Sequence, residues 1–121
     1  MPNCSEKYDL EERTAKFGEN ILRLCKTIKF STLNEPIIKQ LIRSATSVGA
    51  NYMEAVGASS RKDFLNKIFI CKKEIQETKH WLRMLSVVAD DLADELRLLR
   101  KEAQELTLIF HKIANSTKAK N

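Results

Sequence analysis

The run Glu77-Thr78-Lys79-His80 spells Glu-x-x-His, the motif with which some four-helix bundles hold pairs of metal ions. Such a centre requires a second copy of the motif and further inward-facing glutamates, so that carboxylates and imidazoles converge on the metals. The only other histidine is His111, and the residue three places before it is Leu108. We therefore expect no metal, no cofactor and no metal-dependent catalysis.

The glycines do not form a phosphate-binding loop. A Walker loop reads GxxxxGK[ST], whereas Gly57 is followed by ASSRKDF and lacks the GK[ST] end. We predict instead that Gly57 ends a helix in a left-handed conformation and that Ser59 or Ser60 caps the next one, with Asp63 in its first turn. Small residues around Gly49 are expected to let a neighbouring helix approach closely.

Cysteine chemistry is also not indicated. Cys4, Cys25 and Cys71 are far apart and form no ligand or redox spacing, which favours reduced thiols. Cys71 lies on an apolar stripe and is expected to fill space in the core. No local nucleophile and base pair is present, so we expect a protein that is not an enzyme and has no small-molecule substrate.

A line of polar residues runs beside the predicted core. Its members recur at helical spacing in two segments: Arg43, Ser47, Asn51 and Glu54 in the first, and Glu74 and Glu77 in the second. If buried, these groups must pair, since an isolated charge would cost several kcal/mol. Two interpretations stay open: ordinary surface pairs, or a semi-buried network that fixes the register of the bundle or of its subunits.

The net charge of +5 is concentrated in one segment, because residues 61–83 hold seven basic and three acidic side chains. The candidate nucleic-acid contacts in this segment are Lys62, Lys73, Lys79 and Arg83. Phe69 lies among them on a face about opposite the core stripe. It could stack a base, but we favour its burial against another subunit, in which case Phe69→Lys weakens association.

If the segment binds phosphates, replacing Lys73 and Arg83 should weaken binding and flatten its salt dependence, whereas replacing Lys16 and Lys26 should do little. A solvated face that binds nothing, or binds another protein, is the competing interpretation.

Four apolar stripes with spacings of three and four residues must position these groups. The stripes are Leu10, Thr14, Phe17, Ile21, Leu24 and Ile28; Ile38, Leu41, Ala45, Val48, Tyr52 and Ala55; Phe64, Ile68, Cys71, Ile75, Thr78, Leu82 and Leu85; and Leu92, Leu96, Leu99, Ala103, Leu106, Phe110 and Ile113. Short connections between such helices predict an all-α fold, an up-down-up-down antiparallel four-helix bundle.

The bundle is expected to form a single domain over residues 1–121, with a frayed polar tail at 115–121. Asn34 before Glu35 and Pro36 predicts an N-cap for the second helix. Asp90 or Asp91 offers one for the fourth. No leader or membrane-spanning run is seen, so we expect a cytoplasmic protein with no membrane partner.

The segment from Arg43 to Leu85 carries the elements SVGANYMEA, SRKDF, KKEIQET and HWLRML. In these it closely resembles bacterial four-helix-bundle proteins named after intervening sequences in large-subunit ribosomal RNA genes. The resemblance implies an up-down bundle. Relatives of that family, the accessory proteins of diversity-generating retroelements, assemble as basic pentameric barrels that bind nucleic acid and a reverse transcriptase.

These observations together predict a non-enzymatic bundle that forms a homo-oligomer, with a pentamer implied by the resemblance. It is expected to bind RNA or DNA weakly through the third helix. The alternative is a structural or protein–protein interaction module that binds no nucleic acid.

Overall fold

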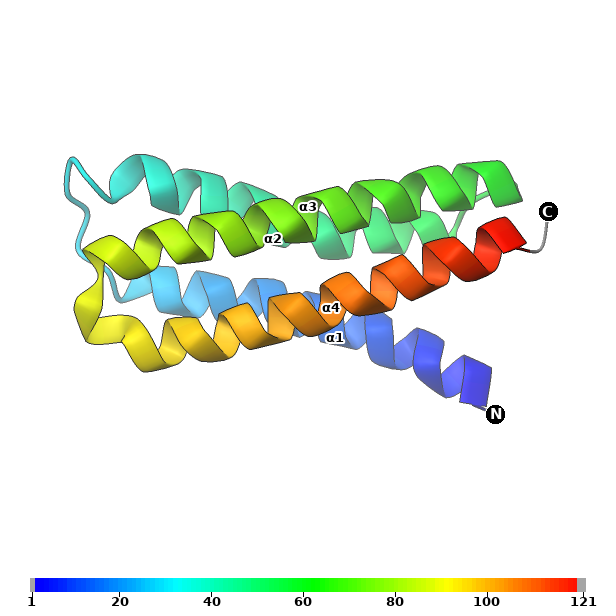
Figure 1. Cartoon of the computed structure of the whole chain (residues 1–121), viewed down its shortest axis with the longest axis horizontal. Helices are drawn as coiled ribbons and strands as arrows, with labels where there is room; N and C mark the ends of the chain where they lie inside the picture. Colours follow the sequence, from blue (N-terminus) through cyan, green and yellow to red (C-terminus); the bar gives the residue numbers. More distant parts are fainter. Residues whose placement is uncertain (1, 120–121) are drawn as a thin grey trace.

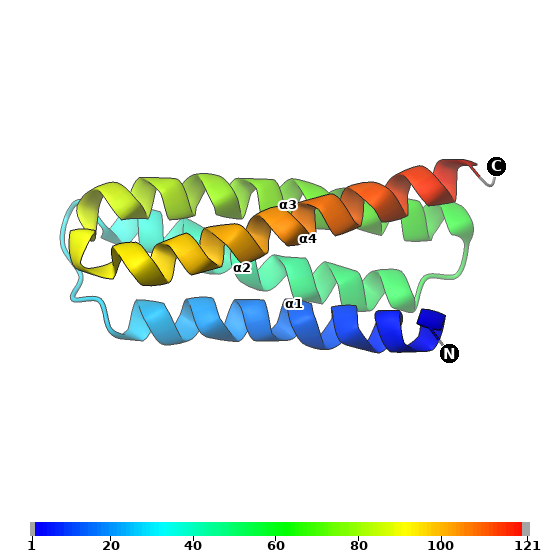
Figure 2. The same cartoon turned by 60° about the horizontal axis from the view of Figure 1, so that its bottom comes forward.

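Four long helices follow one another along the chain and alternate in direction (Figure 1). The computed structural model describes residues 2–119, with side chains from Leu10 onward. The elements are α1 (Pro2–Lys26), α2 (Glu35–Val56), α3 (Arg61–Val88), the 3₁₀ turn η1 (Asp90–Leu92) and α4 (Ala93–Ala119). Figures 1 and 2 place the α1–α2 and α3–α4 connections at one end of the bundle and the α2–α3 connection at the other. The predicted all-α up-down bundle is confirmed.

The four predicted stripes form the core. Phe17, Ile21, Ile75, Leu106 and Phe110 are among the side chains with almost no exposed surface. Ile28, Phe64, Leu92 and Ile113, at the ends of the stripes, are only partly buried against it, as is Leu99. The stripe spacing therefore identifies the face that each helix turns toward the others.

Buried hydroxyls on these stripes find partners close by. Thr14 Oγ1 donates to the Leu10 carbonyl at 2.9 Å. Thr78 Oγ1 lies 2.8 Å from the Glu74 carbonyl and 2.9 Å from Ser44 Oγ, which joins α3 to α2. A bonded hydroxyl escapes the penalty of an unsatisfied buried donor, so threonine is tolerated at these core positions.

Two of the predicted helix starts, at Ser60 and at Asn34, differ in how they are capped. Ser60 is extended, with φ −149° and ψ 162°, and its side chain accepts a hydrogen bond from the Asp63 amide at 3.0 Å, as predicted. Asn34 precedes α2 as expected, but its side chain makes no cap hydrogen bond. Its φ of −91° and ψ of −22° are helical, whereas a capping residue is normally extended. Instead, Asn34 accepts from the Ser31 amide and donates to the Lys29 carbonyl, bracing the α1–α2 loop.

The predicted left-handed conformation of Gly57 is wrong. Its φ is −89° and its ψ is 9°, and its amide donates to the Met53 carbonyl at 3.3 Å. The next amide, of Ala58, donates to the Ala55 carbonyl at 3.0 Å. The last carbonyls of α2 are thus satisfied by a tightened right-handed turn, which does not require glycine.

Helix α3 ends where Ala89 leaves the helical conformation, with φ −131° and ψ 64°. Asp90 and Asp91 belong to the 3₁₀ turn, and no side chain caps that turn. Helix α4 continues to Ala119, so residues 115–119 of the tail that was expected to fray are helical. Thr117 Oγ1 donates to the Ile113 carbonyl at 2.8 Å. Residues 120–121 of the predicted tail lie outside the described part of the chain.

The small residues of α2 do admit a neighbouring helix. A Cβ placed on Gly49 would lie 3.5 Å from the Thr14 carbonyl oxygen, so the backbone of α1 passes close to this point. The crossing leaves a shallow groove of about 380 Å³ between α1 and α2, beside the exposed side chains of Leu22 and Met53.

Candidate nucleic-acid interface

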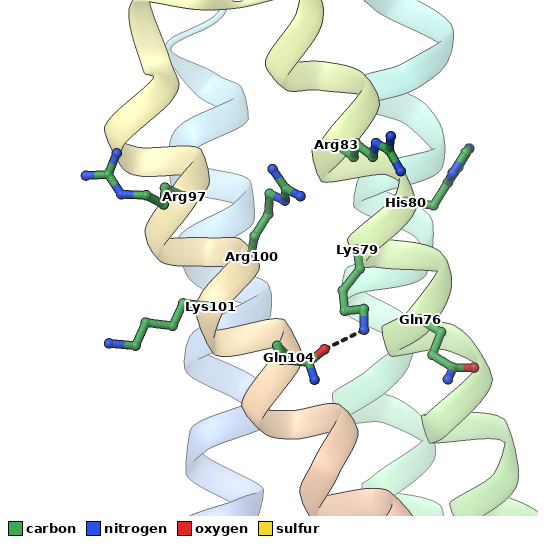
Figure 3. Close-up of a pocket in the computed structure, with 8 residues that line it drawn as sticks. All are labelled: Gln76, Lys79, His80, Arg83, Arg97, Arg100, Lys101 and Gln104. Carbon is green, nitrogen blue, oxygen red and sulfur yellow. Dashed lines mark hydrogen bonds between the residues drawn. The ribbon is translucent and has the colours of Figure 1, made fainter.

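A groove of about 610 Å³ runs between α3 and α4 near the end where they are connected (Figure 3). We call it the basic groove; it is lined by Gln76, Lys79, His80, Arg83, Arg97, Arg100, Lys101 and Gln104. Figure 3 shows Lys79 and Arg100 reaching into the space between the helices, while Arg97 and Lys101 extend along the outer side of α4. Five cationic side chains therefore line the depression, of which Arg97 and Lys101 point away from α3.

The helical repeat places the groove residues of α3 on the side of that helix that faces α4. On α3, Phe69, Lys72, Gln76, Lys79 and Arg83 follow one another at steps of three and four residues, which places them on one side of the helix. This side faces a matching line on α4. Lys79 Nζ donates to Gln104 Oε1 at 2.6 Å, and Lys72 Nζ lies 2.8 Å from His111 Nδ1.

We refer to these two facing lines as the α3–α4 seam. Seven residues forward on α3, from Lys72 to Lys79, correspond to seven residues back on α4, from His111 to Gln104. At the far end of the seam the Lys118 ammonium lies 4.9 Å from the centre of the Phe69 ring. The seam therefore links the basic groove to an exposed aromatic side chain.

Acidic side chains of the same helices point elsewhere. Glu74 and Glu77 turn toward α2, where both pair with Arg43. Glu102 and Glu105 of α4 turn toward α1 and pair with Arg13. The hydrogen bond to Glu102, and to a smaller extent the one to Glu105, raises the pKa of the Arg13 guanidinium further above its usual value. No acidic residue is among those lining the basic groove in the described chain.

The groove consequently has little internal charge compensation. Arg97 Nη1 is 3.1 Å from Asp94 Oδ1, but both side chains are more than 70% exposed, so solvent screens the pair. Lys79 has a neutral amide partner. Cations held on facing helices repel one another, and an anion bound between them would relieve that repulsion.

The predicted nucleic-acid residues divide into two pairs. Lys79 and Arg83 line the basic groove, whereas Lys62 and Lys73 are exposed but do not line it. Phe69 is 38% exposed, and the Lys118 ammonium of α4 lies over its ring, so Phe69 borders the α3–α4 seam. The structure thus brings two of the four predicted cations together.

Sequence reasoning missed Arg97, Arg100 and Lys101. Residues 84–121 hold equal numbers of basic and acidic side chains, and that balance concealed the separation of the two signs onto different faces. The available signal was spacing. From Arg97, a step of three or four residues reaches Arg100 or Lys101, and a further step of four or three reaches Gln104, which places them on one side of the helix as Lys79 and Arg83 are.

The predicted polar network is partly assembled. Arg43 bridges Glu74, at 2.9 Å, and Glu77, whose carboxylate also accepts from Trp81 Nε1 at 3.1 Å. Glu74 is buried, with its side chain 9% exposed, so this part is semi-buried.

The other three predicted members make their contacts apart from the Arg43 guanidinium. Ser47 Oγ donates to the Arg43 backbone carbonyl at 2.7 Å. Asn51 donates to the carbonyl of Ser47 in its own helix at 2.9 Å. Glu54 pairs with Lys67 at 2.8 Å and raises the pKa of that ammonium. The line predicted on α2 is therefore two separate sets of contacts.

The remaining chemical candidates are accounted for by packing. Glu77 faces Arg43, while His80 lies at the edge of the basic groove, so the two motif residues serve different faces. Burial raises the pKa of the Cys25 thiol to about 11 and that of Cys71 to about 12, which suppresses the nucleophilic thiolate. The Cys4 side chain lies outside the described residues. Across the described side chains, no cluster of three or more potential metal ligands occurs.

The fold and groove define a class: a small antiparallel four-helix bundle with a cationic depression on one face. None of the described helices combines the length and the apolarity that a membrane crossing requires. A sequence model of one family matches residues 6–115. The chain belongs to the 23S rRNA-intervening sequence protein family.

The chain is also similar to individual known proteins. A crystal structure of a protein of unknown function from the S23 ribosomal protein family of Bacteroides thetaiotaomicron has a TM-score of 0.77 and 29% sequence identity, covering 90% of this chain and 97% of that one. Glucose-6-phosphate 1-dehydrogenases from two Helicobacter pylori strains are 34% and 33% identical over 84 residues. The chain matches only 18% of the length of those dehydrogenases.

Proposed function

We propose that the protein binds the phosphate backbone of nucleic acid in the basic groove. The observation that carries this proposal is that Lys79, Arg83, Arg97, Arg100 and Lys101 line one groove that has no lining carboxylate. Phosphate contacts from lysine and arginine supply most of the affinity in binding that is not sequence-specific. RNA is a polyanion of the kind that such a groove fits.

Binding, and not catalysis, is the activity that we propose. The groove offers cations, amides and one imidazole, which suit electrostatic recognition. Lys79 is engaged with Gln104, and the thiols of Cys25 and Cys71 are buried in the core. The match to dehydrogenases covers a small part of those enzymes and brings no active-site argument to this chain.

Salt dependence tests the proposal. Each phosphate neutralised on a single strand contributes about 0.7 to the slope of log affinity against log salt. Five contacts predict a slope of about 3.5, and hence a loss of about a hundredfold in affinity between 50 and 200 mM salt. Fluorescence anisotropy with a labelled RNA oligonucleotide measures both quantities.

The decisive variant is Arg83→Gln/Arg100→Gln, with Lys16→Gln/Lys26→Gln on α1 as a control of equal charge change. The groove variant should flatten the slope by about 1.4 and weaken binding at least tenfold at 100 mM salt, while the control leaves both nearly unchanged. Equal losses in the two variants, or no binding by the unmodified protein at 100 mM salt, would overturn the proposal.

We also propose that the chain self-associates, through the groove between α1 and α2. Support comes from Leu22 and Met53, which are 40% and 65% exposed beside a surface of small residues. Apolar side chains around a shallow groove are typical of a surface that another subunit covers. Met53→Glu should reduce the mass measured by sedimentation at micromolar concentration. A monomeric unmodified protein would exclude this proposal.

A further inference from the structure

We infer that the nucleic acid bound along the α3–α4 seam is single-stranded and that one of its bases stacks on Phe69. This inference rests on the proposed function of the basic groove and specifies its ligand. The starting observation is that the seam does not end with the groove. It continues through Lys72 and His111 to the exposed ring of Phe69, on the same line of α3.

The Phe69 side chain is partly exposed at a basic site. It is 38% exposed, and its contact above the ring is the Lys118 ammonium, 4.9 Å from the centroid. Lys118 itself is exposed and lies in the last turn of α4. An exposed cation–π contact is weaker than the stacking of a base on an aromatic side chain, so a base can displace the ammonium. The released Lys118 is then beside the phosphate of the stacked nucleotide.

The dimensions of the seam suit a short strand. Phe69 and Arg83 are separated by fourteen residues, or about 21 Å at the helical rise of 1.5 Å per residue. At about 3.4 Å per nucleotide along a stacked strand, that length corresponds to roughly six nucleotides. Single-strand sites of this kind commonly span about 4 to 16 nucleotides. A single strand can therefore engage Phe69 and the basic groove at once.

A duplex cannot make the same set of contacts. Its bases are paired and stacked inside the helix, and A-form RNA offers mainly phosphates and 2′-hydroxyls to a protein. A duplex would therefore meet the cations of the basic groove and leave Phe69 unused. The two parts of the seam consequently make separable contributions: the groove gives the salt-dependent affinity, and Phe69 gives the preference for unpaired bases.

The test compares three probes at one salt concentration: a twelve-nucleotide oligouridylate, a twelve-base-pair RNA duplex and inorganic polyphosphate, which has no bases. Phe69→Leu keeps an apolar side chain of similar size but removes the aromatic face. It should weaken oligouridylate binding about tenfold, leave its salt slope unchanged, and leave duplex and polyphosphate binding unchanged. Phe69→Trp should retain or strengthen oligouridylate binding.

Ile70→Ala is the matched control, because Ile70 is the next residue and is equally exposed, at 38%. It should leave all three affinities unchanged. The inference is overturned if Phe69→Leu changes no affinity, or lowers all three equally. It is also overturned if Phe69→Leu dissociates an oligomer in sedimentation, because Phe69 would then be a subunit contact.

The two proposals can fail separately. If Arg83→Gln/Arg100→Gln weakens oligouridylate and duplex binding while Phe69→Leu has no effect, the basic groove binds nucleic acid without selecting single strands. If none of the three probes binds to the unmodified protein, both proposals are overturned.

Discussion

Replacing Arg43 with methionine should destabilise the bundle more than replacing an arginine whose ion pair is fully exposed. Arg43 is the cation that bridges Glu74 and Glu77, and the Glu74 side chain is only 9% exposed. Removal of a partner from a fully buried ion pair costs about 3–5 kcal/mol, whereas exposed pairs contribute about 0–1 kcal/mol. Because the Arg43 side chain is 46% exposed, we place the cost of Arg43→Met between these limits, at about 2 kcal/mol.

Thermal and denaturant unfolding measure this cost. For a chain of this size, about 2 kcal/mol corresponds to a fall of roughly 8 °C in Tm. Arg23→Met is the control, since the Arg23–Glu19 pair on α1 is exposed and 3.7 Å long; it should cost less than about 0.5 kcal/mol. Adding Glu74→Gln to Arg43→Met removes the unpaired carboxylate and should restore about 1 kcal/mol. Equal costs for Arg43→Met and Arg23→Met would refute the reasoning, because Glu74 would then not depend on Arg43.

Three further changes test local features. Ser60→Ala removes the α3 cap and should lower the free energy of unfolding by about 1 kcal/mol, whereas Ser59→Ala should have little effect; urea unfolding of both decides whether the cap lies at residue 60. Asn34→Ala removes two loop hydrogen bonds at a buried site and should lower the free energy of unfolding by about 1–2 kcal/mol in urea. An unchanged free energy of unfolding would contradict this expectation. Cys25 and Cys71 have raised pKa values in the folded state, so in a variant lacking Cys4 a thiol reagent at pH 8 should react with them only as fast as the protein unfolds. Because the unfolded thiols ionise first, their contribution to stability is complete below about pH 9 and is lost as the pH rises toward 11 to 12. Rapid labelling of the native protein would contradict this prediction.

The fold was largely predictable because one signal, the three- and four-residue spacing of apolar residues, directly reports which face of a helix is buried. Ile38 and Leu82 were assigned to the core on that basis, and both are fully buried. Helix ends were harder, since a cap depends on the backbone conformation of a single residue. Ser60 is extended and caps α3, while Asn34 is helical and instead braces a loop, although both residue types are common caps.

The candidate site was only half predictable, for a different physical reason. Lys79 and Arg83 belong to one helix, so their shared face follows from sequence spacing alone. Their meeting with Arg100 depends on how α3 and α4 are rotated and aligned against each other, which the sequence does not state. Counting charges by segment also treated Glu102 as compensation for nearby cations of α4, whereas it turns to Arg13 on α1. Charges compensate one another according to their position in space and not their order in the chain.

Acidic and basic side chains of α4 lie on different faces, so one substitution in the basic groove should raise the free energy of unfolding and weaken RNA binding. Gln104 lines the basic groove, with its Oε1 atom 2.6 Å from Lys79 Nζ. Gln104→Glu replaces an amide by a carboxylate of nearly the same shape, so the contact becomes an ion pair and the repulsion among the surrounding cations decreases. We expect a gain of about 0.5 kcal/mol in the free energy of unfolding, limited by solvent screening.

The same carboxylate would repel a phosphate that enters the groove and would occupy Lys79. RNA affinity should therefore fall about tenfold or more at 100 mM salt, and the salt slope should decrease by about 0.7 for the lost contact. Gln104→Leu is the control without charge: it removes the amide partner of Lys79 but should leave the affinity within about threefold. A higher free energy of unfolding together with weaker RNA binding for Gln104→Glu would show that the cationic groove lowers the stability of the fold. A loss of both stability and affinity would instead make Gln104 a packing residue, and unchanged affinity would place the nucleic acid elsewhere.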